Sequence, residues 1–444
     1  MLTKDQANTV IDRVRAASKA DEVHVSLDSG ESANIRFARN SPSTSGNAVD
    51  TSMSVRSVFG KRSGSVRINQ LDDETVERAV RRSEEIAKLA PEDPEEMPAL
   101  GPQSYTAIPG AYRDSVLERG QAQMAQGVKT CIEAALAKDL VGAGFANLSA
   151  GAEAIGNSAG LFGYHRATSA HFSQTVRTPD GRGSGWASDA GREVGELDFG
   201  RNASVAIDKA IRSADPQPLD PGKYVTILEP ACVANLVGML LFSMSARSAD
   251  EGRSFFAKQG GGNRLGETLF PKTVNIHSDP TDATVPGSPW SGDSLPQVRR
   301  DWIKDGAVAN LSYDRFWAQK NNVAPVPSPS NTIMAGGTGT TEDLIKSTKR
   351  GVLITSLWYI RSVDPKSMLF TGLTRDGVFW IENGEIVRPL TNFRWNDSPV
   401  AVLKGIEAMS ESARVSPRSW RSNTVRVPAL RVKEFELSSV SDAV

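Results

Sequence analysis

Residues Lys223–Ala246 read KYVTILEPACVANLVGMLLFSMSA, an almost wholly apolar stretch in the middle of a chain of 444 residues. Tyr224–Leu228 has the composition of a strand, and Pro230 stands where proline fits best, in the first turn of a helix. From Ala231 to Ala246 the residues are apolar and compatible with a helix, so we expect a helix that is buried on nearly every side. It is shorter than the roughly 20 apolar residues that span a membrane, which predicts a core helix.

The bulk composition excludes several classes of protein. Fifty-one basic residues against 52 acidic ones give a formal net charge of −1, so no basic excess indicates nucleic-acid binding. The two cysteines, Cys131 and Cys232, form no disulfide framework and have no metal-ligand spacing, which is typical of a reducing compartment. The N-terminal segment is amphipathic, without the apolar core or cleavage site of a signal peptide. We therefore expect a cytoplasmic protein without a membrane segment.

The length predicts two or three domains. Two proline-bearing segments, 91–102 and 216–222, have the composition of linkers. We predict an N-terminal α+β domain, a middle helix-and-strand region and a C-terminal β-rich domain, over residues 1–98, 103–215 and 220–444. The fold class is α+β: an N-terminal domain of α/β type with helices packed on a sheet, then a C-terminal domain dominated by antiparallel strands.

The periodicity of the sequence predicts the elements on either side of the central stretch. Helices are expected over 4–18, 74–89, 111–137, 198–214 and 399–410. Consecutive strands are expected over 143–178, strand or turn over 311–320, and a last strand over 425–435. The Ser/Asn/Gly-rich residues 40–48 are expected to form a loop. Asn383–Gly384 is the residue pair of a type I′ turn, which predicts a hairpin in GVFWIENGEIV.

Three patterns resemble functional motifs and have simpler explanations. Gly156–Gly160 reads GNSAG and matches the nucleophile elbow of serine hydrolases, but strand-like residues follow where that motif needs a helix, so we expect a turn between strands. The glycine-rich Ala335–Thr341 lacks the Gly-Lys-Ser/Thr of a phosphate-binding loop. A turn before a helix with Thr341 as its N-cap is a sufficient explanation for this segment. His165 and His171 share a strand face, but six strand residues span roughly 20 Å, too far for one zinc ion. His24 and His277 are isolated.

Several long segments together resemble one family, the TldD/TldE proteins, whose TldE branch is also called PmbA. Residues 56–90 resemble the first domain of the family, and NSAGLFGYHRATSAHFSQTV resembles its middle part. Residues 271–322 and 327–357 resemble its C-terminal domain, and RDGVFWIENGEIVRPL is the strongest match. These segments cover most of the chain in the family's order.

The resemblance implies a metallopeptidase fold, and the chain departs from the metal motif. The TldD branch carries HExxxH on a helix, with a cysteine near the C-terminus; two histidines one turn apart hold a zinc ion, and the glutamate acts as general base. The corresponding helix here reads EPACVANLVGML and contains no histidine, and Cys232 alone does not make a site. Residues 410–424 contain no cysteine. We therefore expect no catalytic or metal-binding residue and no cofactor in this chain.

Without these metal ligands the chain resembles the TldE/PmbA branch, the partner subunit of a heterodimeric zinc metallopeptidase that cuts unstructured peptides. We expect a TldD-like partner that carries the zinc, and a homodimer stays possible. We expect peptide to add along a strand edge at Thr355, Ser356, Leu357, Trp358 and Tyr359, against the alternative of an interior strand. A scaffold or modulator protein without a proteolytic role, and an autonomous hydrolase with an unrecognised site, are the alternative functions.

Overall fold

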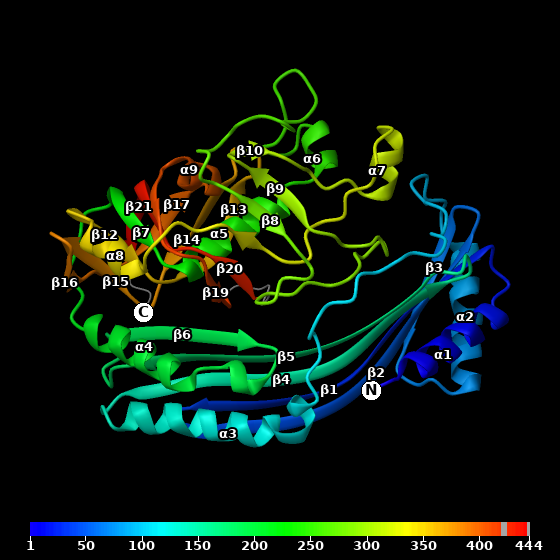
Figure 1. Cartoon of the computed structure of the whole chain (residues 1–444), viewed down its shortest axis with the longest axis horizontal. Helices are drawn as coiled ribbons and strands as arrows, with labels where there is room; N and C mark the ends of the chain where they lie inside the picture. The colour runs from blue at the N-terminus through cyan, green and yellow to red at the C-terminus, as the bar shows by residue number, and fades with distance from the viewer. Residues whose placement is uncertain (419–423, 442–444) are drawn as a thin grey trace.

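The computed structural model describes residues 1–418 and 424–441. The first half of the chain forms a single antiparallel sheet with helices (Figure 1). Its elements are α1 (Lys4–Ala17), β1 (Glu22–Ala38), β2 (Ser41–Phe59), β3 (Arg62–Ile68), α2 (Asp73–Leu89), α3 (Ser115–Leu136), β4 (Val141–Asn157), β5 (Phe162–Arg177), β6 (Ser184–Gly191), the 3₁₀ turn η1 (Val194–Glu196) and α4 (Phe199–Arg212). The strand order is β3-β2-β1-β4-β5-β6. The sheet thus takes strands from both 1–98 and 103–215, the first two of the predicted domains.

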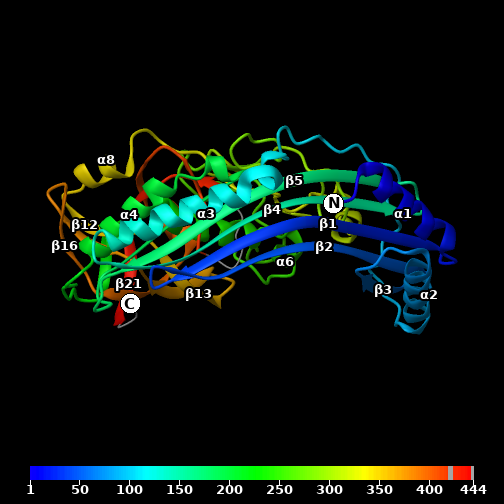
Figure 2. The ribbon, with the colours of Figure 1, turned by 90° about the horizontal axis from the view of Figure 1, so that it is seen from below.

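All the long helices of this half cover one face of the sheet, as Figure 2 shows for α1, α3 and α4. The cause is the two-residue period of a strand. Val23, Val25 and Leu27 of β1 are buried beneath the helices, whereas the intervening His24 and Ser26 face the other way. The opposite face of the sheet is therefore polar and is turned toward the second half of the chain.

The predicted loop at residues 40–48 is wrong, because residues 41–48 belong to β2 and only Asn40 lies in a turn. They pair with β1 through the whole hairpin, from Ser41 opposite Ala38 to Val58 opposite Glu22. Arg39 and Asn40 both have positive φ, which makes the tight turn between the strands. Residues 41–50 are exposed on both faces, so no alternation of apolar residues marks them as a strand.

The second half of the chain is β-rich and contains two sheets, ordered β13-β14-β17-β21-β7-β12-β15-β16, with β18 on β21, and β10-β9-β8-β11-β20-β19. Most neighbours are antiparallel; β7 with β12 and β11 with β20 are parallel. Its elements are β7 (Gly222–Leu228), α5 (Pro230–Phe242), α6 (Ala246–Asp250), β8 (Ile276–Ser278), β9 (Arg300–Lys304), β10 (Ala307–Val308), α7 (Arg315–Lys320), β11 (Ile333–Met334), α8 (Thr341–Lys346), β12 (Arg350–Ile354), β13 (Leu357–Asp364), β14 (Leu369–Thr374), β15 (Val378–Glu382), β16 (Glu385–Pro389), β17 (Asn392–Asp397), α9 (Pro399–Lys404), β18 (Ile406–Met409), β19 (Ala413–Val415), β20 (Val425–Val427) and β21 (Leu430–Ser441). The predicted α+β class is confirmed.

The central apolar stretch forms the strand and buried helix that its sequence predicts. β7 leads into α5, Pro230 occupies the first turn, and most residues of α5 are buried in the core shared with the surrounding strands. The helix is shorter than predicted and ends at Phe242. The Ser245 side chain then accepts a hydrogen bond from the backbone of Ser248 and caps a second helix, α6, which begins at Ala246.

Other predictions of the second half are partly right. The hairpin at Asn383–Gly384 is confirmed, with positive φ at both residues. Residues 311–320 are not a strand, because Asp314 caps the short helix α7. The helix predicted over 399–410 ends at Lys404, after which residues 406–409 pair with β21 as a strand. In residues 399–410 a short helix and a strand lie too close together for a periodicity window to separate them.

Candidate functional site

The start of α5 is held by an ion pair across the two halves of the chain. Lys209 Nζ of α4 lies 2.6 Å from Glu229 Oε2, and both side chains are mostly buried. Cys232, one turn further, is fully buried, and its thiol donates a hydrogen bond to the Ile354 carbonyl at 3.4 Å. Burial raises the pKa of Cys232 well above its usual value, and the nearby Glu229 adds to the shift. The thiol is therefore neutral and inert at neutral pH.

The side chains of α5 do not fit a zinc ion. Its one amide, Asn235, donates to the Ala231 carbonyl at 3.1 Å, and its buried Oδ1 has no partner among the described residues. Within residues 1–418 and 424–441 no group of three or more His, Cys, Asp or Glu side chains is arranged to hold a metal ion. Glu229 is paired with a lysine and Cys232 is protonated, so neither offers a free anionic donor.

The residues predicted to bind peptide lie where β12 gives way to β13. Thr355, Ser356 and Leu357 are buried, and the Thr355 hydroxyl donates to the Asp376 carbonyl at 3.0 Å. Trp358 is half-buried, whereas Tyr359 is 56% exposed with a φ of 51°. β13 is the terminal strand of its sheet and pairs with β14 on one side. The segment therefore lies at an edge, and its binding of peptide stays a prediction.

Next to this edge lies a buried ion pair that the sequence analysis missed. Arg418 Nη2 is 2.7 Å from Asp376 Oδ2, and the Asp376 side chain has no exposed surface. Ser184 Oγ of β6 donates to Asp376 Oδ1 at 2.6 Å. Arg418 also donates to Thr175 Oγ1 of β5 at 3.1 Å. The pair thus joins both halves of the chain, and its members are too distant in sequence to suggest one another.

Two indole rings surround the guanidinium of Arg418. Its central carbon lies 4.9 Å from the ring centre of Trp186 on β6 and 5.6 Å from that of Trp358 on β13. Burial lowers the pKa of Arg418 to about 10, and the charge of Asp376 opposes that shift. The guanidinium is therefore charged at neutral pH, and the ring faces attract it. Trp358 is the residue shared by the predicted peptide edge and this cluster.

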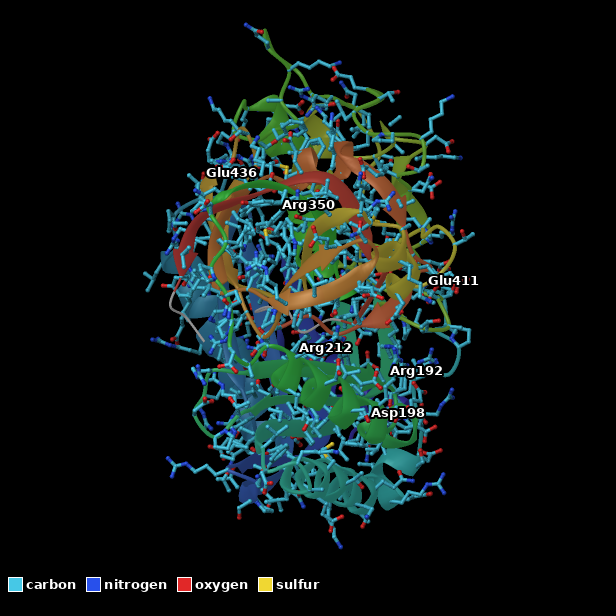
Figure 3. The ribbon with its side chains drawn as sticks, turned by 90° about the vertical axis from the view of Figure 1, so that its left-hand side faces the viewer. Arg192, Asp198, Arg212, Arg350, Glu411 and Glu436 are labelled. Atoms are coloured by element: carbon cyan, nitrogen blue, oxygen red, sulfur yellow. The ribbon has the colours of Figure 1, made fainter. Side chains whose placement is uncertain are left out.

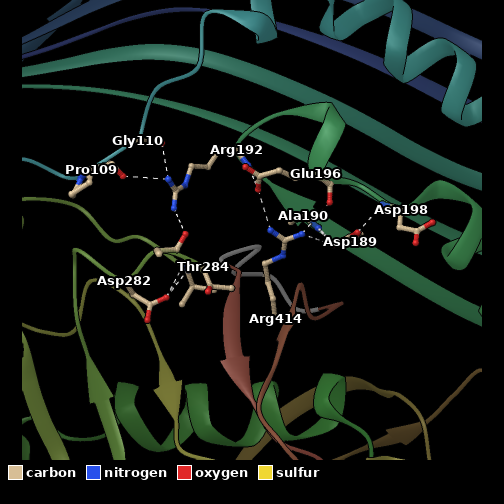
Figure 4. A network of polar contacts seen from close by, with 12 residues as sticks. Pro109, Gly110, Asp189, Ala190, Arg192, Glu196, Asp198, Asp282, Thr284 and Arg414 are labelled. Atoms are coloured by element: carbon tan, nitrogen blue, oxygen red, sulfur yellow. Dashed lines mark hydrogen bonds and ion pairs between the residues drawn. The ribbon is translucent and has the colours of Figure 1, made fainter.

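A second network of polar contacts connects the two halves of the chain (Figure 4). Arg192, which follows β6, donates to the Gly110 carbonyl at 2.7 Å and also to the Ala283 carbonyl. Arg414 of β19 donates to Glu196 Oε2 at 3.1 Å and lies 3.4 Å from Asp189. Figure 3 shows Arg192 on the lower half, near the boundary with the upper half. These contacts position the polar face of the first sheet against the C-terminal strands.

The remaining sequence motifs have structural roles. Residues 156–160 include the end of β4 and the turn that leads to β5, so the predicted turn between strands is present. His165 and His171 both lie on β5, and burial lowers the pKa of each. The predicted N-cap Thr341 is wrong by one residue: Thr340 caps α8 and forms a capping box with Asp343.

Two further cysteine predictions concern other parts of the chain. Cys131 is buried in α3 as predicted, with its thiol 3.4 Å from the Phe199 carbonyl. Of the segment 410–424, in which the family's cysteine is expected, residues 419–423 lie outside the described residues.

Comparison with known proteins identifies two matching family models. The PmbA/TldA metallopeptidase C-terminal domain matches residues 221–439, and PmbA/TldA metallopeptidase domain 1 matches residues 24–87. Among curated proteins, no sequence matches the chain significantly.

Several solved structures share the fold across almost the whole chain. TldE from Thermococcus kodakarensis has a TM-score of 0.86 at 18% identity, covering 97% of this chain and 99% of that one. A Thermotoga maritima MSB8 protein proposed to modulate a DNA gyrase has a TM-score of 0.85 at 18% identity, covering 97% and 99%. A Bacteroides thetaiotaomicron VPI-5482 protein, proposed to modulate DNA gyrase, has a TM-score of 0.85 at 17% identity, covering 99% and 100%. At these identities the likeness shows the fold.

Proposed function

Because the chain belongs to the PmbA/TldD family of metallopeptidases, we propose that it is the metal-free subunit of a heterodimeric zinc metallopeptidase that acts on unstructured peptides. The observation that carries this proposal is the donor set of α5. Glu229 is neutralised by Lys209, Cys232 is a buried thiol, and no histidine is present on the helix. Such a helix can stabilise the fold but offers no ligands for a metal. A catalytic helix would instead hold a zinc ion and leave one of its coordination positions open. The zinc and the general base then belong to a TldD-like partner in the cytoplasm.

The proposed contribution of this chain is to bind the peptide beside the partner's active site. β13 offers an unpaired edge within the described residues, with Trp358 half-buried and Tyr359 exposed along it. An extended peptide that adds to such an edge gains main-chain hydrogen bonds without a folded substrate. That mode suits unstructured substrates, because their backbone groups are free to pair.

The first test is the metal content of the chain purified alone without chelator, measured by mass spectrometry. We expect close to zero zinc per chain and no peptidase activity. Activity is expected to appear only when the chain is co-purified with a paralogue that carries HExxxH. About one tightly held zinc ion per chain, or peptidase activity of the chain alone, would instead support an autonomous hydrolase.

The peptide edge is tested by photo-crosslinking. A photoreactive phenylalanine analogue at Tyr359 is expected to crosslink to an unstructured peptide. The same analogue at Val49, which is 71% exposed on β2, is the matched control on another strand. Equal labelling at the two positions would contradict a peptide site on β13.

A second candidate function follows from the two structural neighbours proposed to modulate a DNA gyrase. Their coverage of nearly the whole chain favours testing it, although the near-neutral charge of this chain offers no general attraction to DNA. The modulator would then act on the enzyme and not on the nucleic acid. A supercoiling assay with gyrase, with and without the chain, distinguishes this function from the peptidase subunit.

A further inference from the structure

A cavity lined by described residues lies away from α5, between the polar face of the first sheet and the C-terminal half. Its volume is about 570 Å³, which is within the range of small-molecule sites. One wall is the sheet, through His24 and Ser26 of β1, Arg56 of β2 and Asn157 at the end of β4. The other walls are the segment after α2, at residues 93–97, a loop of the C-terminal half, at residues 292–294, and the start of α7, at residues 314–316. In Figure 1 this region is the end of the molecule where β3 and α7 approach each other.

The charged groups that line this cavity do not balance. Five carboxylates contribute to the lining, against two guanidinium groups, and Arg247 pairs with one of the five from outside the lining, which leaves two negative charges in excess. The carboxylates belong to Asp93, Glu95, Glu96, Asp293 and Asp314, and the guanidinium groups to Arg56 and Arg315. The histidine on the wall does not change the balance at neutral pH, because burial lowers the pKa of His24.

The positive groups are already engaged by the protein. Arg56 is paired with Glu96, and Arg315 donates to the Pro98 carbonyl. Arg247, which lies outside the lining, binds Glu95 with both terminal nitrogens at 2.6 and 2.7 Å. An anionic ligand would therefore have to displace existing pairs.

Three carboxylates of the lining, in contrast, can accept further hydrogen bonds. Asp93 uses Oδ1 for the backbone of Glu95, and Asp314 uses Oδ1 for the backbone of Trp317. Asp293 contributes a third carboxylate to the lining, and this residue is exposed. An ionised carboxylate accepts up to about four hydrogen bonds and donates none, so these three carboxylates favour a ligand that donates.

The cavity also has an apolar part. Met97, Leu161 and Phe316 contribute carbon surface beside the carboxylates. Long basic side chains combine these two requirements, because their methylene stems pack on apolar surface while the cationic ends reach polar groups. A small inorganic cation would not contact the apolar surface, and a purely apolar ligand would not contact the carboxylates.

We propose that this cavity binds a guanidinium or ammonium group on an aliphatic stem, as in an arginine or lysine side chain. The group comes either from a free basic compound or from an extended peptide. The inference rests on the cavity alone, and it stands whether or not the chain has a metal-bearing partner. If the chain does bind peptide substrates, the site adds a preference for basic side chains at a distance from β13.

Calorimetric titration of the full chain tests the proposal with three probes. The first is an unstructured peptide with a single arginine, the second is the same peptide with citrulline in its place, and the third is N-acetylarginine amide. We expect the arginine peptide to bind at least tenfold tighter than the citrulline peptide, because citrulline keeps the shape and lacks the charge. Binding of the third probe comparable to the peptide assigns the site to free basic compounds; much weaker binding assigns it to peptides.

Variants connect the binding to this cavity. Asp293→Asn and Asp93→Asn together remove two charges while an amide oxygen can still accept the Glu95 hydrogen bond. We expect about a tenfold loss of affinity for each charge-assisted hydrogen bond removed. Glu342→Gln on α8 is the matched control, since it removes one exposed charge at the opposite end of the molecule (Figure 1). Ser54→Phe, which fills the cavity without changing its charge, is also expected to abolish binding.

Three results would overturn the proposal: no binding of the arginine peptide, equal affinity for the citrulline peptide, or the same affinity in the double variant as in Glu342→Gln. A thermal unfolding scan of each variant accompanies the titrations. It shows whether the variants are folded, so that a loss of binding is read only from folded protein.

Discussion

At the scale of single residues, the strongest constraint is the buried pair of Asp376 and Arg418. Its charges are shielded from water by two indole rings and satisfied by Ser184 and a threonine of β5. Burying two charges costs several kcal/mol for each ion, and only close pairing with further hydrogen bonds offsets that cost. The pair is therefore sensitive to the loss of one partner.

Asp376→Asn is expected to destabilise the fold by about 3–5 kcal/mol, because it leaves the Arg418 guanidinium buried without a counter-charge. The measurement is the free energy of unfolding in urea. Arg82→Gln is the control, since it breaks an exposed pair with Glu85 and is expected to cost about 0.5 kcal/mol or less. Similar losses for the two variants would contradict the role assigned to the buried pair.

The histidines predict how stability depends on pH. Burial is the largest cause that lowers the pKa of His24, His165, His171 and His277 in the folded protein. An unfolded histidine titrates near pH 6.5, so below that pH the unfolded chain binds more protons than the folded one. We therefore expect stability that is complete above roughly pH 6.5 and falls as the pH is lowered toward the folded pKa values.

The measurement is the urea midpoint between about pH 7.5 and pH 5. His165→Gln combined with His171→Gln is expected to reduce the slope, whatever its effect on the midpoint itself. Glu153, which faces His165 across β4 and β5, and Asp397 have raised pKa values and act in the opposite direction at lower pH. A slope unchanged by the double variant would show that other groups cause the pH dependence.

At the scale of elements, α5 organises the C-terminal half because it is apolar on every side. The strands of both sheets pack around it, so removal of a buried side chain leaves a cavity that neighbours cannot easily fill. The N-cap residue Glu229 also fixes the start of α5, because it pairs with Lys209 of α4.

Leu236→Ala in α5 is expected to cost about 2–5 kcal/mol of unfolding free energy, because this side chain is 1% exposed. Leu89→Ala is the matched control, since Leu89 ends α2 with 87% of its surface exposed. It is expected to change stability by about 0.5 kcal/mol or less. Comparable losses in the two urea titrations would show that α5 is not packed as described.

At the scale of the whole molecule, the two halves are joined by polar contacts, with the helices of the first sheet on its far side. Arg192 and Arg414 reach across the boundary to carbonyl and carboxylate groups. Hydrogen bonds and ion pairs depend on direction and distance, so these contacts fix the orientation of the two halves. Apolar packing would attract the halves without fixing their orientation. The polar face of the first sheet, on the side of this boundary, also lines the cavity.

Arg414→Met is expected to loosen this boundary without unfolding either half. The change removes the ion pairs with Asp189 and Glu196, and hydrogen exchange is expected to become faster in η1 and β19. Arg78→Met, which breaks an exposed pair with Glu74 on α2, is the control. Unchanged exchange in η1 and β19 would show that the boundary is maintained by other contacts.

The sequence alone determined the local elements that have a strong chemical signature. α5 follows from its continuous apolar run and Pro230, and the hairpin at Asn383–Gly384 follows from the need for positive φ at both residues. The departure of α5 from a metal motif is likewise visible in the residues, because histidine is absent from it.

Only the tertiary structure decided what the distant residues form together. The strand at residues 41–50 has no buried face, so its pairing with β1 and not its composition makes it a strand. Asp376, Arg418 and Ser184 are far apart in sequence, and only folding places them in one cluster. The cavity likewise combines β1, the segment after α2, the loop near residue 293 and the start of α7. Contacts of this kind depend on chain topology, because no local pattern specifies which segments will face each other.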